Sequence, residues 1–120
     1  MGWDDDHTRS ERLAAEAELA TRAGDRPRAE ELYGKAAETE ARALEQVPSG
    51  KQRTLGITAV SAVALWYKSR DFTGAERLAY QYLGGLQLPS FAQLQLRELL
   101  NVIWTTQSAR VDDRSDHDGG

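Results

Sequence analysis

Residues 24–29 read Gly-Asp-Arg-Pro-Arg-Ala, and residues 70–75 read Arg-Asp-Phe-Thr-Gly-Ala. In each segment an Asp stands four residues before an Ala, where one apolar helical run ends and the next begins. The earlier runs span residues 13–20 and 55–67. Asp at such a position caps a helix by accepting a hydrogen bond from a backbone N–H of the first turn. The repeated pattern therefore predicts two helical hairpins stacked side by side.

Apolar periodicity and helix-breaking residues extend these hairpins to an all-α domain of about five helices, with no strand. The expected helices lie between Thr8 and Gly24, from Asp25 to Pro48, from about Gln52 to Ser69, from Asp71 to Gly84, and after Pro89. The first helix is expected to begin with a capping box, because Thr8 and Glu11 have the required spacing. Short connections predict that successive helices are antiparallel.

The third expected helix is apolar on every face over residues 57–67. A helix of this kind is normally enclosed by others, so we expect it to be the central element. Two alternatives are open for its second apolar face. Its neighbours cover it, or it stays partly open for a partner or for a second copy of the chain.

Both ends of the chain are polar and acidic. Residues 1–8 and 110–120 carry few apolar side chains, so we expect them to be disordered on either side of a helical domain over residues 9–109. On this reading, deletion of both ends leaves the thermal stability almost unchanged.

Composition argues against several function classes. The 120 residues carry a net charge of −4 and no Cys, which disfavours nucleic-acid binding and excludes disulfide or thiolate chemistry. The longest apolar run, residues 62–67, is far shorter than the ~20 residues of a membrane span. The acidic N-terminus does not resemble a signal peptide, so a cytoplasmic location is expected.

Catalysis, a cofactor and a metal site are not expected. His7 and His117 are flanked by Asp residues, but both lie in the ends expected to be disordered, where nothing fixes ligand geometry. The expected folded region has neither His nor a glycine-rich phosphate loop. Arg22, Arg26, Arg28, Arg70 and Arg77 lie near the two turns, which makes a nucleic-acid-linked regulator a third and least favoured hypothesis.

The hairpins resemble the tetratricopeptide repeat (TPR). The matching positions are Ala17, Gly24, Asp25, Ala29, Tyr33 and Ala36 in the first unit, and Asp71 and Ala75 in the second. The resemblance implies two TPR-like hairpins followed by a C-terminal capping helix. It departs from the family in spacing, because Asp25 and Asp71 are 46 residues apart and the family repeats every ~34 residues.

The TPR resemblance also implies a function. Members of the family bind peptides or helices on the inner face made by the first helix of each hairpin, so we expect a non-catalytic protein-interaction module, a small scaffold or accessory subunit. The Lys and Asn clamp of one subclass is absent from that face. The alternative is a self-associating module that forms a homodimer. The expected partner-binding residues are Glu18, Arg22, Ile57, Val60, Ala64, Tyr67 and Lys68.

Overall fold

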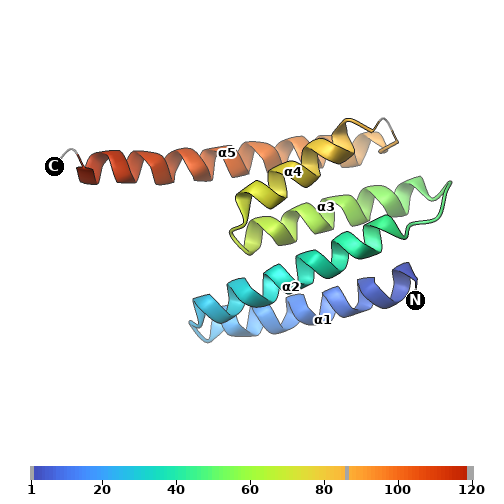
Figure 1. The fold of residues 1–120 in the computed structure, drawn as a ribbon, viewed down its shortest axis with the longest axis horizontal. Helices are drawn as coiled ribbons and strands as arrows, with labels where there is room; N and C mark the ends of the chain where they lie inside the picture. The colour runs from blue at the N-terminus through green and yellow to red at the C-terminus, as the bar shows by residue number, and fades with distance from the viewer. Residues whose placement is uncertain (1, 86, 119–120) are drawn as a thin grey trace.

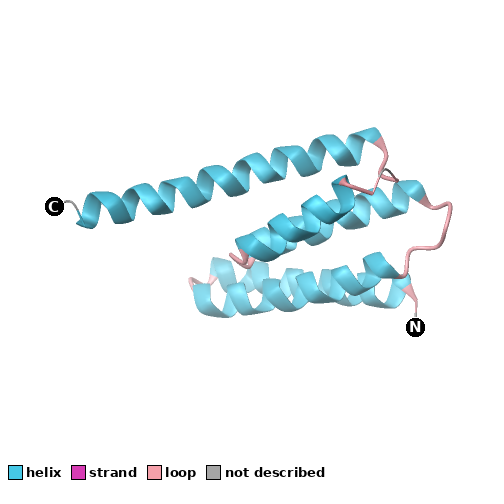
Figure 2. Ribbon diagram, turned by 45° about the horizontal axis from the view of Figure 1, so that its top comes forward, coloured by secondary structure: helices cyan, strands magenta, loops and turns pink. Residues whose placement is uncertain are grey.

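The computed structural model describes residues 2–85 and 87–118, with side chains described as far as residue 109. This part of the chain holds five α-helices and no strand, which confirms the all-α class (Figures 1 and 2). The helices are α1 (Trp3–Arg22), α2 (Arg26–Glu45), α3 (Gln52–Lys68), α4 (Phe72–Leu83) and α5 (Ser90–Asp118).

Successive helices run in opposite directions and form a flat stack of 55 × 33 × 17 Å (Figure 1). α1 packs on α2, α2 packs on α3, and α3, α4 and α5 pack on one another. Over their described residues, α1 and α3 share no extensive packed interface. α2 therefore bridges these two helices, and a groove can open between them.

Both predicted Asp caps are present at the starts of the second helices. Asp25 Oδ1 accepts from the Arg28 backbone N–H at 3.2 Å, and Asp71 Oδ1 accepts from the Gly74 backbone N–H at 2.8 Å. The residue before each Asp has a left-handed backbone, with φ of 79° at Gly24 and 66° at Arg70. The two turns thus have the same geometry, as their repeated sequence predicts.

The core has two parts that meet on α3. The larger cluster joins α3, α4 and α5 around the fully buried Val63, Leu96 and Ile103. The smaller cluster joins α2 to α3 through Ala36, Ala37 and Leu65. Because α3 contributes to both clusters, its predicted central position is confirmed.

The expectation of a disordered N-terminus is wrong, because α1 begins at Trp3. Asp4, Asp5 and Asp6 lie in its first turn, where negative charge is stabilised by the positive end of the helix dipole. The capping box expected at Thr8 is also wrong, since Thr8 lies inside the helix. An acidic composition suits the first turn of a helix as well as a disordered end.

The C-terminal expectation also differs from the structure. Disorder was expected from residue 110, but α5 continues to Asp118. Leu96, Leu100 and Ile103 anchor the first part of α5 in the core. A helix already nucleated gains one hydrogen bond for each added residue, and the sequence has neither Gly nor Pro between residue 104 and Asp118.

Deleting residues 1–8 should lower the melting temperature by more than about 5 °C, because a loss above 1 kcal/mol has this effect in a domain of this size. The deletion removes the hydrogen bond from Trp3 to Thr58 and the contact of His7 with Glu40. Thermal unfolding followed by circular dichroism measures the effect. Arg9→Ala, an exposed change in the same helix, is the control. An unchanged melting temperature in the deletion variant would show that Trp3 is not docked.

Candidate functional site

The seven residues predicted to bind a partner do not all lie on one open surface. Glu18, Arg22 and Lys68 are exposed, and Ile57 is 45% exposed. Ala64 is half-buried, and Val60 and Tyr67 are half-buried against the larger core cluster. The predicted face is therefore open at Ile57 and Lys68 and half-buried at Val60, Ala64 and Tyr67.

A groove of about 310 Å³ lies where α1 and α3 end, and it includes two of the predicted residues, Tyr67 and Lys68. Its first side is Thr21 of α1, and its other side is formed by α3 with Arg70 of the following turn. Residues of α2 complete the lining: Arg26, Ala29, Glu30 and Tyr33. This α1–α3 groove thus combines aromatic rings with charged side chains.

Tyr67 also contacts two residues that are not part of the groove lining. Its hydroxyl lies 3.1 Å from Thr106 Oγ1 on α5, and its ring lies 5.6 Å from the Phe72 ring. These contacts connect the groove wall to the core. Tyr67 is therefore a poor residue for testing binding alone, because its loss would disturb packing as well.

Three cationic side chains and one carboxylate line the groove. Lys68 Nζ lies 5.7 Å from the centre of the Tyr33 ring, within range of a cation–π interaction. Arg70 Nε lies 3.9 Å from Glu30 Oε1, and both of these side chains are more than a third exposed. An ion pair this long and this exposed contributes little to stability, so the groove keeps a positive character.

Arg70 holds an unfavourable backbone conformation at the edge of the groove. Among the described residues it is the only non-glycine residue with positive φ, and this conformation costs an L-residue about 1 kcal/mol. At the matching position of the first turn the chain has Gly24. Arg70 therefore supplies a guanidinium at a position where glycine suits the backbone better.

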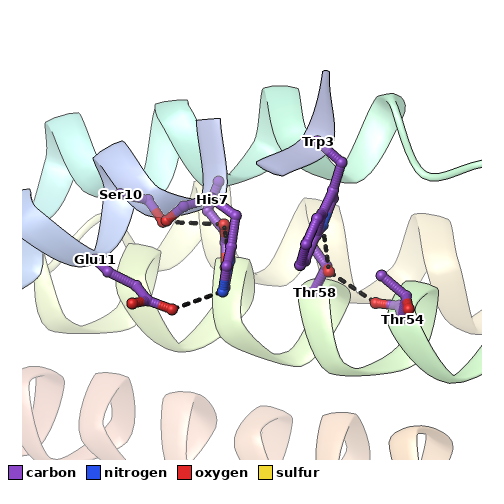
Figure 3. A network of polar contacts seen from close by, with 7 residues as sticks. Trp3, His7, Ser10, Glu11, Thr54 and Thr58 are labelled. Carbon is purple, nitrogen blue, oxygen red and sulfur yellow. Dashed lines mark hydrogen bonds and ion pairs between the residues drawn. The ribbon is translucent and has the colours of Figure 1, made fainter. Parts of the chain in front are cut away.

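At the opposite end of α1, a cluster of polar side chains holds this helix against α2 (Figure 3). His7 Nδ1 lies 3.0 and 3.1 Å from the two carboxylate oxygens of the fully buried Glu40, and His7 Nε2 lies 2.7 Å from Glu11 Oε1. Ser10 Oγ lies 3.0 Å from Glu40 Oε1. We call His7, Ser10, Glu11 and Glu40 the His7 cluster.

Trp3 connects the same end of α1 to α3. Its ring stacks on the His7 ring, with centres 4.6 Å apart and planes 12° from parallel. Trp3 Nε1 donates to Thr58 Oγ1 at 3.0 Å, and the Thr58 hydroxyl donates to the Thr54 carbonyl oxygen at 2.7 Å (Figure 3). The N-terminal end of α1 is thus attached to α3, whereas its C-terminal end borders the groove.

A second hollow, of about 590 Å³, lies beside Trp3 and extends to Gln46 and Lys51. Gln46 Nε2 donates to Asp6 Oδ2 at 2.7 Å, while the buried Gln46 Oε1 has no hydrogen-bond partner. Among the described residues that line this hollow, Lys51 is the only Lys or Arg, whereas the α1–α3 groove has three.

Sequence reasoning missed an exposed apolar stripe on α5. Phe91, Leu94 and Val102 are 36%, 59% and 45% exposed, and their spacing places them on one side of the helix. In the sequence these three residues are as hydrophobic as the buried Leu96, Leu100 and Ile103, so hydrophobicity alone does not separate exposed from buried positions. Only the position of α5 on α3 and α4 decides which residues are covered.

Among the described residues, no group of three or more His, Asp or Glu side chains is placed to hold a metal ion. The described helices also lack the combination of length and apolar character that a membrane crossing requires. Comparison of the chain with protein-family models, curated proteins and solved structures found no match.

Proposed function

We propose that this chain is a non-catalytic, TPR-like protein-interaction domain that binds a segment of another protein in the α1–α3 groove. The observation that carries the proposal is the composition of the groove, in which the half-buried rings of Tyr33 and Tyr67 adjoin exposed charges. Protein interfaces commonly combine an aromatic centre with a polar rim. A cytoplasmic scaffold or accessory subunit is the corresponding role.

Two of the three hydroxyl-bearing side chains among the described groove residues, those of Thr21 and Tyr67, have hydrogen-bond partners within the domain. Thr21 Oγ1 donates to the Ala17 carbonyl oxygen at 2.9 Å, and the Tyr67 hydroxyl contacts Thr106. A nucleophile needs an adjacent general base, and neither hydroxyl has one among these contacts. Both groups are instead held in fixed positions, which suits a preformed binding surface.

Selection of random twelve-residue peptides displayed on phage tests the proposal. We expect enriched peptides to bind the purified domain and to lose at least tenfold in affinity for Thr21→Trp, because the indole fills the groove. Thr105→Trp on α5 is the matched control, since Thr21 and Thr105 are both exposed and both donate to the carbonyl oxygen four residues earlier. Equal losses in the two variants, or the absence of any bound peptide, would contradict the proposal.

A homodimer is the second candidate, and the α5 stripe of Phe91, Leu94 and Val102 is the observation that favours it. Exposed apolar side chains on one helix face are typical of helix–helix association. Light scattering at micromolar concentration should then give twice the chain mass, and Leu94→Glu should restore the mass of one chain. A monomeric mass for the unmodified protein would exclude this candidate.

A further inference from the structure

We infer that the α1–α3 groove selects an acidic peptide segment of the partner, one with several Asp or Glu side chains; this inference rests on the proposed function. The lining contains Arg26, Lys68 and Arg70 against the single carboxylate of Glu30. The whole chain has a net charge of −4. The groove is thus a locally positive site on an acidic protein, and long-range repulsion elsewhere directs an anionic segment to it.

The cations of the groove are available to a ligand. Among the described residues, Lys68 and Arg26 form no ion pair, and the closest described interaction of Lys68 Nζ is with the face of the Tyr33 ring. That contact occupies none of the three ammonium N–H donors with an oxygen atom. Both side chains are exposed, so a carboxylate can reach them without displacing a buried group.

Arg70 gives the second line of support. Its only described ion-pair contact is the 3.9 Å approach of Nε to Glu30, and its guanidinium carbon lies 5.3 Å from the centre of the Phe72 ring. The Arg70 side chain is 44% exposed, so its guanidinium can reach a carboxylate and bind it with two hydrogen bonds.

The backbone at this position makes the role of the side chain testable. Arg70 has a φ of 66°, and the equivalent residue of the first turn is Gly24. Glycine adopts this conformation more readily than arginine. Replacement of Arg70 by Gly therefore removes the backbone strain and also removes the positive charge. The stability of the fold should rise, while the affinity for an acidic peptide should fall.

Fluorescence anisotropy with labelled peptides of eight Glu, eight Gln or eight Lys residues tests the inference at low salt. We expect the Glu peptide to bind and the other two to bind at least tenfold more weakly. Arg70→Gly and Lys68→Gln should each weaken binding of the Glu peptide about tenfold, the effect of losing one charged hydrogen bond. Arg70→Gly should also raise the melting temperature.

Arg97→Gln is the matched control, because Arg97 is exposed on α5 and lies outside the groove lining. Equal binding of the Glu and Gln peptides would overturn the inference, and so would an Arg97→Gln effect as large as that of Arg70→Gly. If phage-selected peptides still bind the unmodified domain and lose affinity for the Thr21→Trp variant, the proposed function stands and only the preference for acidic segments is wrong. If no selected peptide binds, the proposed function itself fails.

Discussion

Replacement of Glu40 by Ala should lower the free energy of unfolding by about 3 kcal/mol, the order of loss expected when a buried, hydrogen-bonded side chain is truncated. Glu40 is fully buried on α2, and its carboxylate contacts His7 Nδ1 and Ser10 Oγ from α1. The truncation removes the partner of His7 Nδ1, leaves Ser10 Oγ with the His7 carbonyl oxygen as its acceptor, and creates a cavity between the two helices. Urea unfolding at neutral pH measures the loss.

Glu38→Ala is the control for this prediction, because Glu38 is exposed on the same helix, two residues away. Its effect should stay within about 0.5 kcal/mol. Glu40→Gln should lie between the two, because the amide oxygen still accepts a hydrogen bond while the negative charge is lost. If Glu40→Ala were no more destabilising than Glu38→Ala, the His7 cluster would not hold α1 in place.

Two glycine substitutions should change stability with opposite signs. A Cβ atom at Gly56 of α3 would lie 2.9 Å from Ala92 Cβ and 3.0 Å from Pro89 Cγ. Gly56→Ala should therefore force α5 away from α3 and destabilise the fold by roughly 1–3 kcal/mol, as overpacking usually does. This cost exceeds the gain of up to about 1 kcal/mol expected for replacing glycine inside a helix.

Gly34→Ala is the opposite case, because its nearest described neighbour, Ser69 Cβ, would lie 3.9 Å from the added Cβ, an ordinary contact distance. Gly34 lies inside α2, so this substitution should stabilise the protein by about 0.5–1 kcal/mol. Thermal and urea unfolding of the two variants measures whether each substitution raises or lowers the free energy of unfolding. Stabilisation by Gly56→Ala would mean that α3 and α5 do not approach as closely as the structure has them.

Helix number, the two Asp caps and the central position of α3 were predictable because each depends on a local pattern. Asp25 and Asp71 each cap a helix start, and a run that is apolar on every face, as residues 57–67 are, is normally enclosed by other helices. These features need no knowledge of how distant segments meet. The sequence therefore determines the all-α class through short-range signals.

The N-terminal end of α1 was mispredicted because its partners are distant in the chain. His7 meets Glu40, 33 residues away, and Trp3 meets Thr58, 55 residues away. The hydrophobic periodicity of a sequence does not indicate which distant residues meet. Acidic residues are also common both in a disordered end and in the first turn of a helix.

The groove was predictable only in part. Tyr67 and Lys68 are predicted from the first helix of the second hairpin, whereas Tyr33 is on a second helix and is not among the predicted partner-binding residues. Arg26 and Arg70 were noted near the turns, but only the packing of α1, α2 and α3 brings them into one lining. The angle between α1 and α3 depends on the sum of these contacts and has no local signal.

Backbone amide chemical-shift mapping tests the proposed binding groove most directly. The ¹⁵N-labelled protein would be titrated with a phage-selected peptide, and the shifts would be followed for every assigned amide. The groove predicts the largest changes within residues 21–33 and 64–71, with little change along the outer face of α5. Changes centred on Phe91, Leu94 and Val102, with the groove amides unaffected, would contradict it.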